Sequence, residues 1–473
     1  MAATNIVWLR NDLRVADNPA LSAAAAEPGR TVALYVHEQT EGVRPTGAAG
    51  RWWLHQSLRS LAADLAENGV ELLVESGDSR ILLPAFAQEL SAATVFWNRR
   101  YAPGERETDH LIKEELQALG VRASSLPGNV LVEPWEIATG QGKPYSVFTP
   151  FWKTLRQQPI SAPQPPTVQN LPAIATPAVD GDYRPPQWST KLTSHWRVGE
   201  AAAHRRLEEF FDQLLASYSD GRDFPHRRAT SGLSPHLRFG EISPRQIWHA
   251  ALALAQAEPD RQGAIEKFLS ELAWRDFSYH QLFHRLDIGK LPMQPKYEGM
   301  QWRSAPGELT AWQRGQTGIP IVDAGMREMW ATGFMQNRVR MLAASFLTKN
   351  LLIDWRLGEE WFWDCLVDAD PANNPASWQW VAGSGMDAAP YFRIFNPVTQ
   401  GEKFDTDGAY TRHWVPELSR LPDRWLHRPG EAPADVLRSA GIVLGRDYPP
   451  PLVDLRTSRS RALEAAAALV KSE

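Results

Sequence analysis

Residues 230–244, TSGLSPHLRFGEISP, bring hydroxyl groups and exposed backbone amides together directly before helical sequence. Amides and hydroxyls at the start of a helix can hold a phosphate group where no P-loop is present. A polar loop that only caps the helix has the same composition, and on these residues alone it is the more common structure. The candidates for a phosphate contact are Thr230, Ser231, Gly232 and Ser234.

Residues 270–277, SELAWRDF, place a carboxylate, an indole and a guanidinium on one face of a predicted helix. Glu271, Trp274 and Arg275 are three and four positions apart, so their side chains are neighbours. Such a set suits recognition of a planar heterocycle with an adjacent phosphate. The alternative is an ordinary ion pair beside a tryptophan of the core.

Two further segments, MQNRVRM (335–341) and VDADPANNPASWQW (367–380), are rich in polar and aromatic side chains. The second offers Asp368 and Asp370 as carboxylates to pair with Arg340. A dense set of this kind, within apolar helical sequence, suggests a large bound aromatic ligand. The candidates in both segments are Asn337, Arg338, Arg340, Met341, Asp368, Asp370, Asn373, Asn374, Trp378 and Trp380.

His280 and His284 have a spacing that metal sites use, four positions apart on a predicted helix. No third ligand or zincin-type glutamate lies nearby in the sequence, so we predict that this pair binds no metal. The single cysteine, Cys365, excludes an internal disulfide framework and any site with several cysteine ligands. We therefore expect a protein without a metal centre.

The elements that must position these residues fall into two kinds, and the first kind occupies residues 1–130. Short β-rich runs alternate there with helical patterns, which predicts an α/β domain with a parallel sheet covered by helices. No G-x-G-x-x-G follows the first run, so the usual dinucleotide fingerprint is absent. The predicted strands are 5–9, 31–36, 70–75, 94–98 and 121–125, and the clearest helices are 51–69, 81–92 and 105–120.

A proline-dense connector is predicted for residues 131–196, because proline continues neither helices nor central strands. Helical periodicity then dominates residues 197–473, which predicts an all-α second domain. Ser243 and Pro244 read as the N-cap and first residue of one of its helices. The predicted helices include 201–218, 243–257, 264–286, 325–334, 338–352 and 462–471.

The overall composition allows two or three domains in the 473 residues and an ample core, with 43% hydrophobic residues. No apolar run is long enough to cross a membrane, and the N-terminus lacks the order of a secretion signal. We expect a cytoplasmic monomer. The net charge of −5 shows no global affinity for nucleic acid, although a local basic face is compatible with it.

Long blocks of the chain resemble the photolyase/cryptochrome family. The resemblance implies an α/β antenna domain, a connector and a helical domain that binds FAD. The positions that match its FAD site are Tyr218, Thr230, Ser231, Gly232, Leu233, Ser234, Arg340, Asp368, Asp370 and Asn373. The blocks include VWLRNDLRVADNPAL, TSGLSPHLRFGEIS, ELAWRDF, WQRGQTGIPIVDAGMREM and DADPANNPASWQWVAGSGMDAAPYFRIFNPVTQGEKFD.

The same resemblance implies an enzyme, a deoxyribodipyrimidine photo-lyase that splits cyclobutane pyrimidine dimers in ultraviolet-damaged DNA. A dimer must leave the duplex to react, and a poorly stacked pair is cheaper to extrude. One electron from photoexcited reduced FAD is implied to open the ring and then return. The positions that match the dimer pocket are Glu271, Trp274, Asn337, Met341 and Trp380, with Glu271 and Asn337 hydrogen-bonded to the lesion.

Tryptophans and arginines supply two further implied sets. Trp378, Trp355 and Trp302 match the chain that carries an electron from the surface to the flavin, although three core residues would have the same spacing. Trp330, Trp361 and Trp363 are further tryptophans that could form a second branch of this electron chain, although their spacing alone does not show one. The arginines that match contacts to DNA phosphates are Arg222, Arg275, Arg338 and Arg393.

The antenna chromophore and the choice between repair and signalling depend on fewer residues. Glu105 lies where folate-binding members carry an acidic residue, which favours methenyltetrahydrofolate over a deazaflavin or FMN. Asn373 faces the flavin N5 in the family, and plant cryptochromes carry Asp there. Asn373 therefore favours repair, and a blue-light receptor of the cryptochrome type is the alternative.

Overall fold

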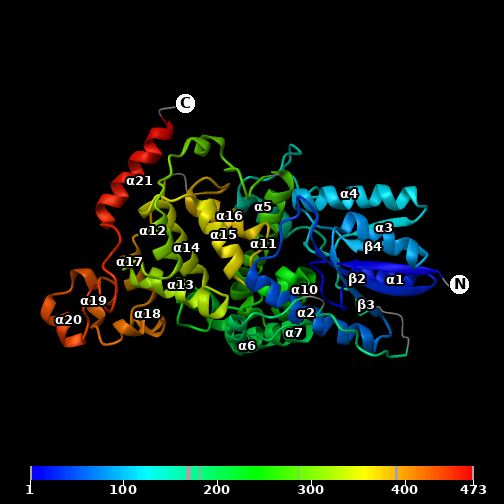
Figure 1. Ribbon diagram of the computed structural model, residues 1–473, viewed down its shortest axis with the longest axis horizontal. Helices are drawn as coiled ribbons and strands as arrows, with labels where there is room; N and C mark the ends of the chain where they lie inside the picture. Colours follow the sequence, from blue (N-terminus) through cyan, green and yellow to red (C-terminus); the bar gives the residue numbers. More distant parts are fainter. Residues whose placement is uncertain (1–2, 167–171, 181–182, 286, 389–391, 471–473) are drawn as a thin grey trace. The chain divides into compact units, whose positions relative to one another are not determined.

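A computed structural model describes residues 3–166, 172–180, 183–285, 287–388 and 392–470 (Figure 1). Its only sheet among these residues has five strands in the order β3-β2-β1-β4-β5, with every neighbouring pair parallel. The predicted parallel sheet is therefore confirmed. The strands are β1 (Thr4–Leu9), β2 (Arg30–Glu38), β3 (Glu71–Gly77), β4 (Ala92–Asn98) and β5 (Arg122–Leu126).

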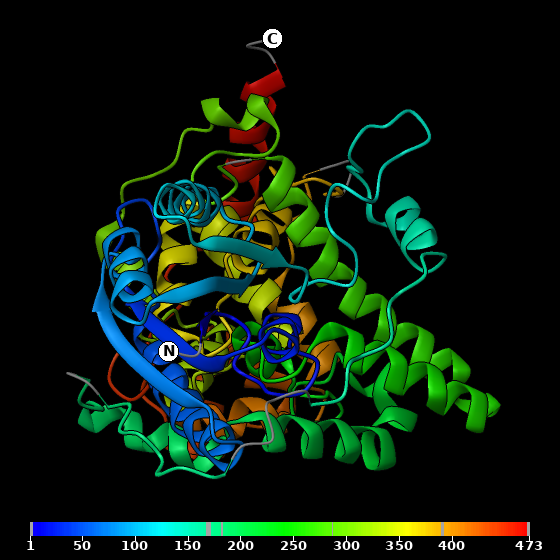
Figure 2. The same ribbon diagram turned by 90° about the vertical axis from the view of Figure 1, so that its right-hand side faces the viewer.

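Both faces of this sheet are covered by helices, as Figure 2 shows. Successive side chains of a strand point to opposite faces, so a strand buried on both sides is apolar throughout. In β1, Val7 and Leu9 join one core cluster, while Ile6 and Trp8 join another. The first core takes in α1 (Pro19–Ala26) and α2 (Ala48–Glu67), and the second α3 (Ser79–Glu89) and α4 (Pro103–Ala118).

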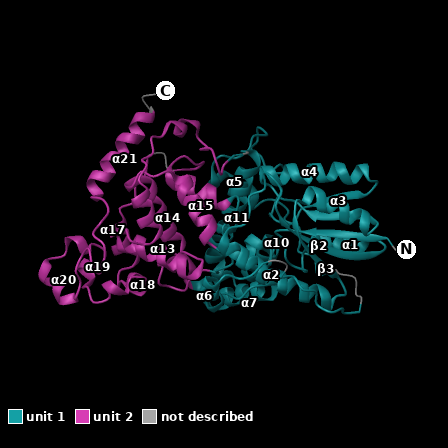
Figure 3. Cartoon of the chain, viewed as in Figure 1, with its two compact units in different colours: residues 1–216, 231–287, 367–372 teal, residues 217–230, 288–366, 373–473 magenta. Residues whose placement is uncertain are grey.

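The chain forms two compact units, each assembled from segments that are distant in the sequence (Figure 3). Unit 1 contains Met1–Ala216, Ser231–Asp287 and Val367–Ala372, and so includes the sheet. Unit 2 contains Ser217–Thr230, Ile288–Leu366 and Asn373–Glu473. The predicted connector holds two helices within its described part, and its residues 167–171 and 181–182 lie outside the described residues. These helices are α5 (Phe148–Leu155) and α6 (Thr190–His195).

The rest of unit 1 is helical, as predicted. Ser243 caps α10 through its hydroxyl, which accepts a hydrogen bond from Gln246 N at 3.0 Å, and Pro244 is the first helical residue. The predicted helix 201–218 is interrupted by a π-helical turn at Phe210–Leu214. The elements are α7 (Glu200–Glu209), α8 (Leu215–Gly221, which runs into unit 2), α9 (Ser234–Phe239), α10 (Pro244–Ala257) and α11 (Gln262–His284).

Unit 2 has no strand among its described residues, apart from one isolated bridge between Leu444 and Tyr448. Several of its helices begin with proline, which needs no amide hydrogen bond at that position. None of the described helices of the chain combines the length and apolarity needed to cross a membrane. The helices of eight or more residues are α12 (Pro306–Gln313), α13 (Pro320–Thr332), α14 (Asn337–Ser345), α15 (Trp355–Cys365), α16 (Asn373–Ala382), α17 (Pro397–Phe404) and α21 (Leu455–Val470).

The shorter helices of unit 2 connect these. They are the π-helical turn η5 (Phe346–Asn350), the helices α18 (Ala409–Trp414), α19 (Asp423–Leu426) and α20 (Ala434–Ala440), and the 3-10 turns η4 (Pro295–Gly299), η6 (Pro416–Leu418) and η7 (Pro429–Glu431). The predicted helix 338–352 corresponds to α14 followed directly by η5.

Gly240 joins the end of α9 to the loop after β1, inside unit 1. Its φ of 70° is the left-handed conformation, and a Cβ there would lie 2.1 Å from the Asn11 carbonyl oxygen. The neighbouring backbone is hydrogen-bonded, with Leu13 N to Phe239 O at 3.0 Å and an Arg14 nitrogen to Gly240 O at 3.0 Å. Because backbone meets backbone at this point, a side chain has no room.

We predict that Gly240→Ala lowers the thermal unfolding midpoint by about 5 °C or more, because it adds a backbone clash to the left-handed strain. Gly120→Ala is the matched control, since Gly120 has a φ of 74° and nothing within 4 Å of its ideal Cβ. The control bears the conformational strain alone and should lose clearly less. The unfolding midpoints are measured by circular dichroism. If both variants lowered the midpoint equally, this account of the contact would be contradicted.

Candidate functional site

The loop that precedes α9 is fixed within unit 1 by two side chains that are distant in the sequence. The Ser234 hydroxyl donates a hydrogen bond to the Asp368 carboxylate at 2.7 Å. Arg206 donates from Nε to the Ser231 carbonyl at 2.8 Å. Gly232, with a φ of 65°, leaves room for that guanidinium. A Cβ added at this glycine would lie only 2.3 Å from the nearest guanidinium nitrogen of Arg206. The structure thus brings Ser234 and Asp368 together, and Arg206 is a partner that sequence reasoning missed.

Asp370 lies two residues further along and has both carboxylate oxygens engaged in unit 1. Oδ2 accepts a hydrogen bond from the Tyr279 hydroxyl at 2.7 Å, and Oδ1 accepts from Ala372 N at 2.9 Å. Burial, together with Asp370, raises the pKa of Tyr279 well above its ordinary value, so the phenol remains a donor. The orientation of the Asp370 carboxylate is therefore set by a tyrosine that no sequence motif indicated.

The helix α11 carries the predicted lesion residues of unit 1. Trp274 stacks on Phe148 with ring centroids 3.8 Å apart and an interplanar angle of 9°. Glu271 forms an ion pair with Lys267 at 3.1 Å, on a partly exposed face. Arg275 is only 9% exposed, and it donates to the Asn129 carbonyl at 2.7 Å. Its predicted phosphate contact stays a prediction, and its burial makes it the least accessible of the four arginines proposed for that role.

In unit 2 the predicted residues gather around the start of α14 and the segment 217–223. Asn337 is the first residue of α14 and is exposed. Arg338 donates to the Asp223 carboxylate at 2.7 Å, and Arg222 donates to the Tyr218 hydroxyl at 3.3 Å. The structure therefore brings two predicted DNA contacts, Arg222 and Arg338, to neighbouring positions.

The remaining predicted residues of unit 2 are placed as follows. Arg340 donates from Nε to the Met335 carbonyl at 2.6 Å, and Met341 is partly buried. Trp380 donates to the Asp387 carbonyl at 3.1 Å, and Arg393 is exposed. Asn373 begins α16, and Thr230 ends the segment 217–230. The predicted pairing of Arg340 with Asp368 or Asp370 stays a prediction.

The three tryptophans of the predicted electron chain differ in burial. Trp378 and Trp355 are 2% and 1% exposed, on α16 and α15, whereas Trp302 is partly exposed. Trp302 packs against a small cluster that includes Leu469 of α21. Two of the three are therefore buried and one is partly exposed, and their role in electron transfer stays a prediction. Trp330 and Trp361, which are not among these three tryptophans, stack on each other with ring centroids 6.1 Å apart and an interplanar angle of 3°.

His280 and His284 lie in edge contact, 4.6 Å between ring centroids. His280 accepts a hydrogen bond at Nε2 from Tyr145 N, and burial next to His284 lowers its pKa to about 4. Both histidines thus have structural partners. In the described part of the chain, the trio close enough to share an ion is His226, Asp405 and Asp407, and Asp405 already caps α18 through two backbone amides.

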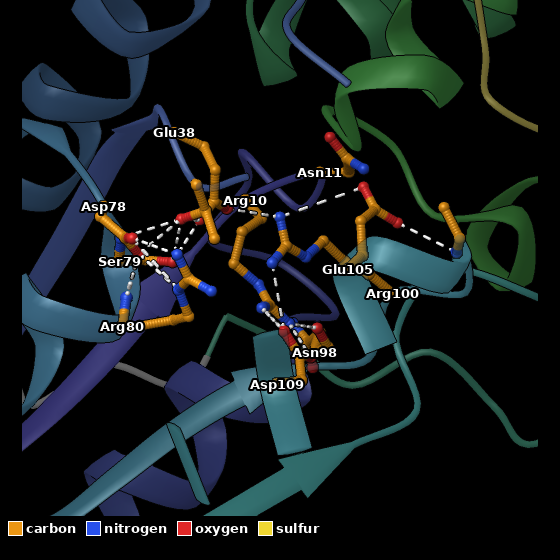
Figure 4. Close-up of polar contacts among 12 residues, drawn as sticks. Arg10, Asn11, Glu38, Asp78, Ser79, Arg80, Asn98, Arg100, Glu105 and Asp109 are labelled. Atoms are coloured by element: carbon orange, nitrogen blue, oxygen red, sulfur yellow. Dashed lines mark hydrogen bonds and ion pairs between the residues drawn. The ribbon is translucent and has the colours of Figure 1, made fainter. Parts of the chain in front are cut away.

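A second polar cluster lies at the carboxyl ends of β1, β2 and β4 (Figure 4). Parallel sheets bind ligands at this edge, where the strand order reverses about β1. Arg10 and Arg100 both donate to Asp109, at 2.8 and 3.1 Å, and Arg100 also donates to Glu38 at 2.8 Å. The Nε groups of both arginines are buried donors that have no hydrogen-bond partner among the described residues.

Charge within this cluster is balanced by carboxylates. Burial lowers the pKa of Arg10, whereas Asp109, Glu105 and Glu38 raise the pKa of Arg100 above its ordinary value against the effect of burial. Glu105, the predicted antenna residue, lies 4.0 Å from Arg100 and accepts a hydrogen bond from Ala102 N at 3.2 Å. Glu105 thus belongs to the cluster and also stabilises the first turn of α4.

The chain is similar to known proteins along nearly its whole length. The description "DNA photolyase" matches residues 5–170, and "FAD binding domain of DNA photolyase" matches residues 268–468. A deoxyribodipyrimidine photo-lyase from Agrobacterium fabrum is 46% identical over 474 residues, covering 99% of this chain and 98% of its own. The chain belongs to the DNA photolyase family. Cryptochrome-1 of Arabidopsis thaliana is 37% identical, over 98% of this chain and 70% of its own.

Solved structures of photolyase relatives agree with that assignment. The crystal structure of a bacterial class III photolyase from Agrobacterium tumefaciens matches with a TM-score of 0.94, at 46% identity, over 100% of this chain and 98% of that one. A cryptochrome from Synechocystis matches with a TM-score of 0.89, at 31% identity, over 98% and 99%. The fold predicted from the sequence is therefore confirmed on both units of this photolyase-family chain.

One acidic group in unit 2 of this photolyase-family chain has a displaced pKa. Glu328, on α13, accepts hydrogen bonds from the Tyr410 hydroxyl at 2.6 Å and from Gln336 N at 3.3 Å. Burial raises the pKa of Glu328 to about 7, although these hydrogen bonds act in the opposite direction. The folded protein therefore holds the proton more tightly than the unfolded chain does, and this contribution to stability is lost as pH rises from about 4.5 to 7.

We predict that Glu328→Gln raises the thermal midpoint at pH 8 relative to the unsubstituted protein, by about 2–4 °C, and changes it little near pH 5. The amide oxygen can still accept from Tyr410 and from Gln336 N, while the ionisation that burial disfavours is removed. Midpoints measured by circular dichroism across pH 5–8 check this. A difference between the two proteins that does not grow with pH would contradict the assignment.

Proposed function

We propose that this protein repairs cyclobutane pyrimidine dimers in ultraviolet-damaged DNA, driven by light through FAD. The observation that carries the proposal is full-length similarity, 46% identity and a TM-score of 0.94, to proteins named as photolyases. The pocket residues support it. Trp274 and Trp380 would stack on an extruded dimer, and Glu271 and Asn337 would hydrogen-bond to its carbonyl edge.

The residues of the predicted flavin site fit FAD by their chemistry. Hydroxyls and backbone amides at the start of α9 suit a diphosphate, and Asp368 and Asp370 are held in fixed orientations by Ser234 and Tyr279. When bound, FAD supplies the electron that opens the cyclobutane ring. The positions proposed to hold it are Tyr218, Thr230, Ser231, Gly232, Leu233, Ser234, Arg340, Asp368, Asp370 and Asn373.

Further roles follow from the same proposal. Trp378, Trp355 and Trp302 would conduct an electron inward to keep the flavin reduced, while Arg222, Arg338, Arg393 and Arg275 would contact phosphates beside the lesion. The division into an antenna domain (1–130), a connector (131–196) and a FAD domain (197–473) belongs to this proposal too. So do the assignments as a monomer, as a cytoplasmic protein and as a protein that binds no metal.

For the antenna we propose methenyltetrahydrofolate, bound near the cluster of Arg10, Arg100 and Glu105 in unit 1. The buried Nε donors of both arginines favour a ligand with acceptor groups, and folates carry carboxylates and a polar ring system. The crystal structure of an archaeal photolyase from Sulfolobus tokodaii, 27% identical, holds two FAD molecules, which imply a novel light-harvesting cofactor in that protein. A second FAD, a deazaflavin or FMN is the alternative, and extraction of the bound chromophore distinguishes them by absorption spectrum.

The second candidate function is that of a cryptochrome-type photoreceptor. It is favoured by the similarity to Arabidopsis and Synechocystis cryptochromes. Asn373 argues for repair, because an amide cannot donate a proton to the flavin as the Asp of plant cryptochromes does. The pocket residues Glu271, Asn337 and Trp380 argue the same way.

The deciding experiment incubates reduced protein with a thymine-dimer oligonucleotide under blue light and in darkness. We expect intact thymines only under light. Glu271→Ala and Asn337→Ala should lower the repair rate about 10-fold or more by removing hydrogen bonds to the lesion, with FAD retained. Lys113→Ala, at a partly exposed position of α4, is a control that should repair normally. Absence of light-dependent repair by the unsubstituted protein would refute the proposal.

For the tryptophan chain, we predict that Trp302→Phe slows photoreduction of oxidised flavin at least about 10-fold, since phenylalanine is far harder to oxidise. Repair by pre-reduced protein should change little, because that reaction needs no electron from the surface. Transient absorption and the repair assay measure the two quantities separately. If both fell together, Trp302 would be structural and not a relay residue.

A further inference from the structure

The first two turns of α14 carry three of the residues proposed to meet DNA: Asn337, Arg338 and Met341. Their position depends on how the helix begins, because the first amides of a helix have no acceptor within it. Gln336, the residue immediately before α14, supplies that acceptor. Its side-chain oxygen accepts from Arg338 N at 2.6 Å and from Val339 N at 3.3 Å.

The other end of the same amide reaches a different segment of unit 2. The Gln336 Nε2 group donates a hydrogen bond to the carbonyl oxygen of Arg222. Gln336 is 6% exposed, so this bond is shielded from water. One buried amide thus joins the start of α14 to the segment that carries Tyr218 and Arg222. The ion pair of Arg338 with Asp223 runs beside it but is more exposed, and contributes less.

The backbone of Gln336 is held as well. Its N–H donates to the Glu328 carboxylate at 3.3 Å, and the same carboxylate oxygen accepts from the buried Tyr410 hydroxyl at 2.6 Å. Gln336 is therefore fixed from three directions, by α14, by the Arg222 carbonyl and by α13. A residue held in this way transmits the position of each element to the others.

The residue type itself favours this bridging role. Serine, threonine, aspartate and asparagine are the preferred N-cap residues, and glutamine is not among them. Serine, threonine and aspartate side chains can accept hydrogen bonds from the first turn. Serine and threonine are too short to reach the Arg222 carbonyl at the same time, and an ionised aspartate has no donor to offer it. Capping alone does not explain a glutamine, whereas a bridge between two segments does.

We infer that Gln336 is a positioning residue for lesion recognition: it holds the Asn337 edge of α14 in register with the Arg222 segment, so that dimer contacts and phosphate contacts are made together. This inference rests on the proposed function. It adds to that proposal a residue that touches neither the dimer nor the phosphate, and that sets the preference for damaged over undamaged DNA.

The test separates the bridge from the cap. Gln336→Ser retains an N-cap hydroxyl and loses the bridge, and Gln336→Ala loses both. Asn396→Ala is the matched control, because Asn396 caps α17 in unit 2 with the same pattern, accepting from Val398 N and Thr399 N, and it makes no bridge among the described contacts. Affinities for a thymine-dimer oligonucleotide and for its undamaged equivalent are measured by fluorescence anisotropy, with bound FAD read from absorbance.

We expect Gln336→Ser to weaken dimer binding about 10-fold and binding of undamaged DNA less than about 2-fold, which lowers the preference for damage about 5-fold or more. Bound FAD and the repair rate at saturating dimer should change less than about 2-fold, and Gln336→Ala should lose at least as much preference as Gln336→Ser. The Asn396→Ala control should keep the preference of the unsubstituted protein.

Three results would overturn the inference. An unchanged preference in Gln336→Ser would mean that the bridge has no part in recognition. Equal weakening for both oligonucleotides would mean that it supports only phosphate binding, and loss of FAD would mean a role in general folding. Failure of the proposed function shows separately, since the unsubstituted protein would then repair no dimers under light.

Discussion

Backbone amides in the first turn of a helix must find acceptors outside that helix, and several residues of the predicted site lie where this constraint acts. Ser234 begins α9, Asn337 begins α14, Trp355 begins α15 and Asn373 begins α16. Glu105 lies in the first turn of α4. Residues at helix starts have part of their backbone turned toward a ligand or a neighbouring segment. For the start of α14 at Asn337, the acceptor is the Gln336 side chain, which caps the helix by accepting from Arg338 N and Val339 N.

Much of the fold could be predicted from the sequence because its pattern is local. Strands buried on both faces are apolar along their whole length, and Ser243 with Pro244 marks a helix start in any context. Some of the candidate site residues stand in short motifs, and the others are implied by the family resemblance. Arg206, Tyr279 and Gln336 could not be found in this way, because each acts on a partner between 25 and 114 positions distant. Long-range pairing of that kind leaves no periodicity in the sequence.

The placement of arginine shows the same limit for electrostatics. Arg10, Arg14, Arg100 and Arg275 are all buried in unit 1, where they are held by carbonyl oxygens and carboxylates. They contribute to the net charge of the chain but little to the field at its surface. Arg393 is exposed, and Arg222 and Arg338 are partly exposed. For the proposed contacts to DNA phosphates, this exposure matters more than the net charge of the chain. A count of charged residues therefore says little about which face of such a protein is basic.

The two faces of β1 differ in the size of the side chains at its carboxyl end. In β1, the pair Val7 and Leu9 faces α1 and α2, while Ile6 and the larger Trp8 face α3 and α4. Arg10 follows directly, so the alternation of the strand also decides to which side its guanidinium turns. A residue inserted between Val7 and Trp8 would move the large Trp8 to the side of the smaller Val7 and turn Arg10 away from Asp109. Natural variation in length is therefore expected in the loops between elements and not within this strand.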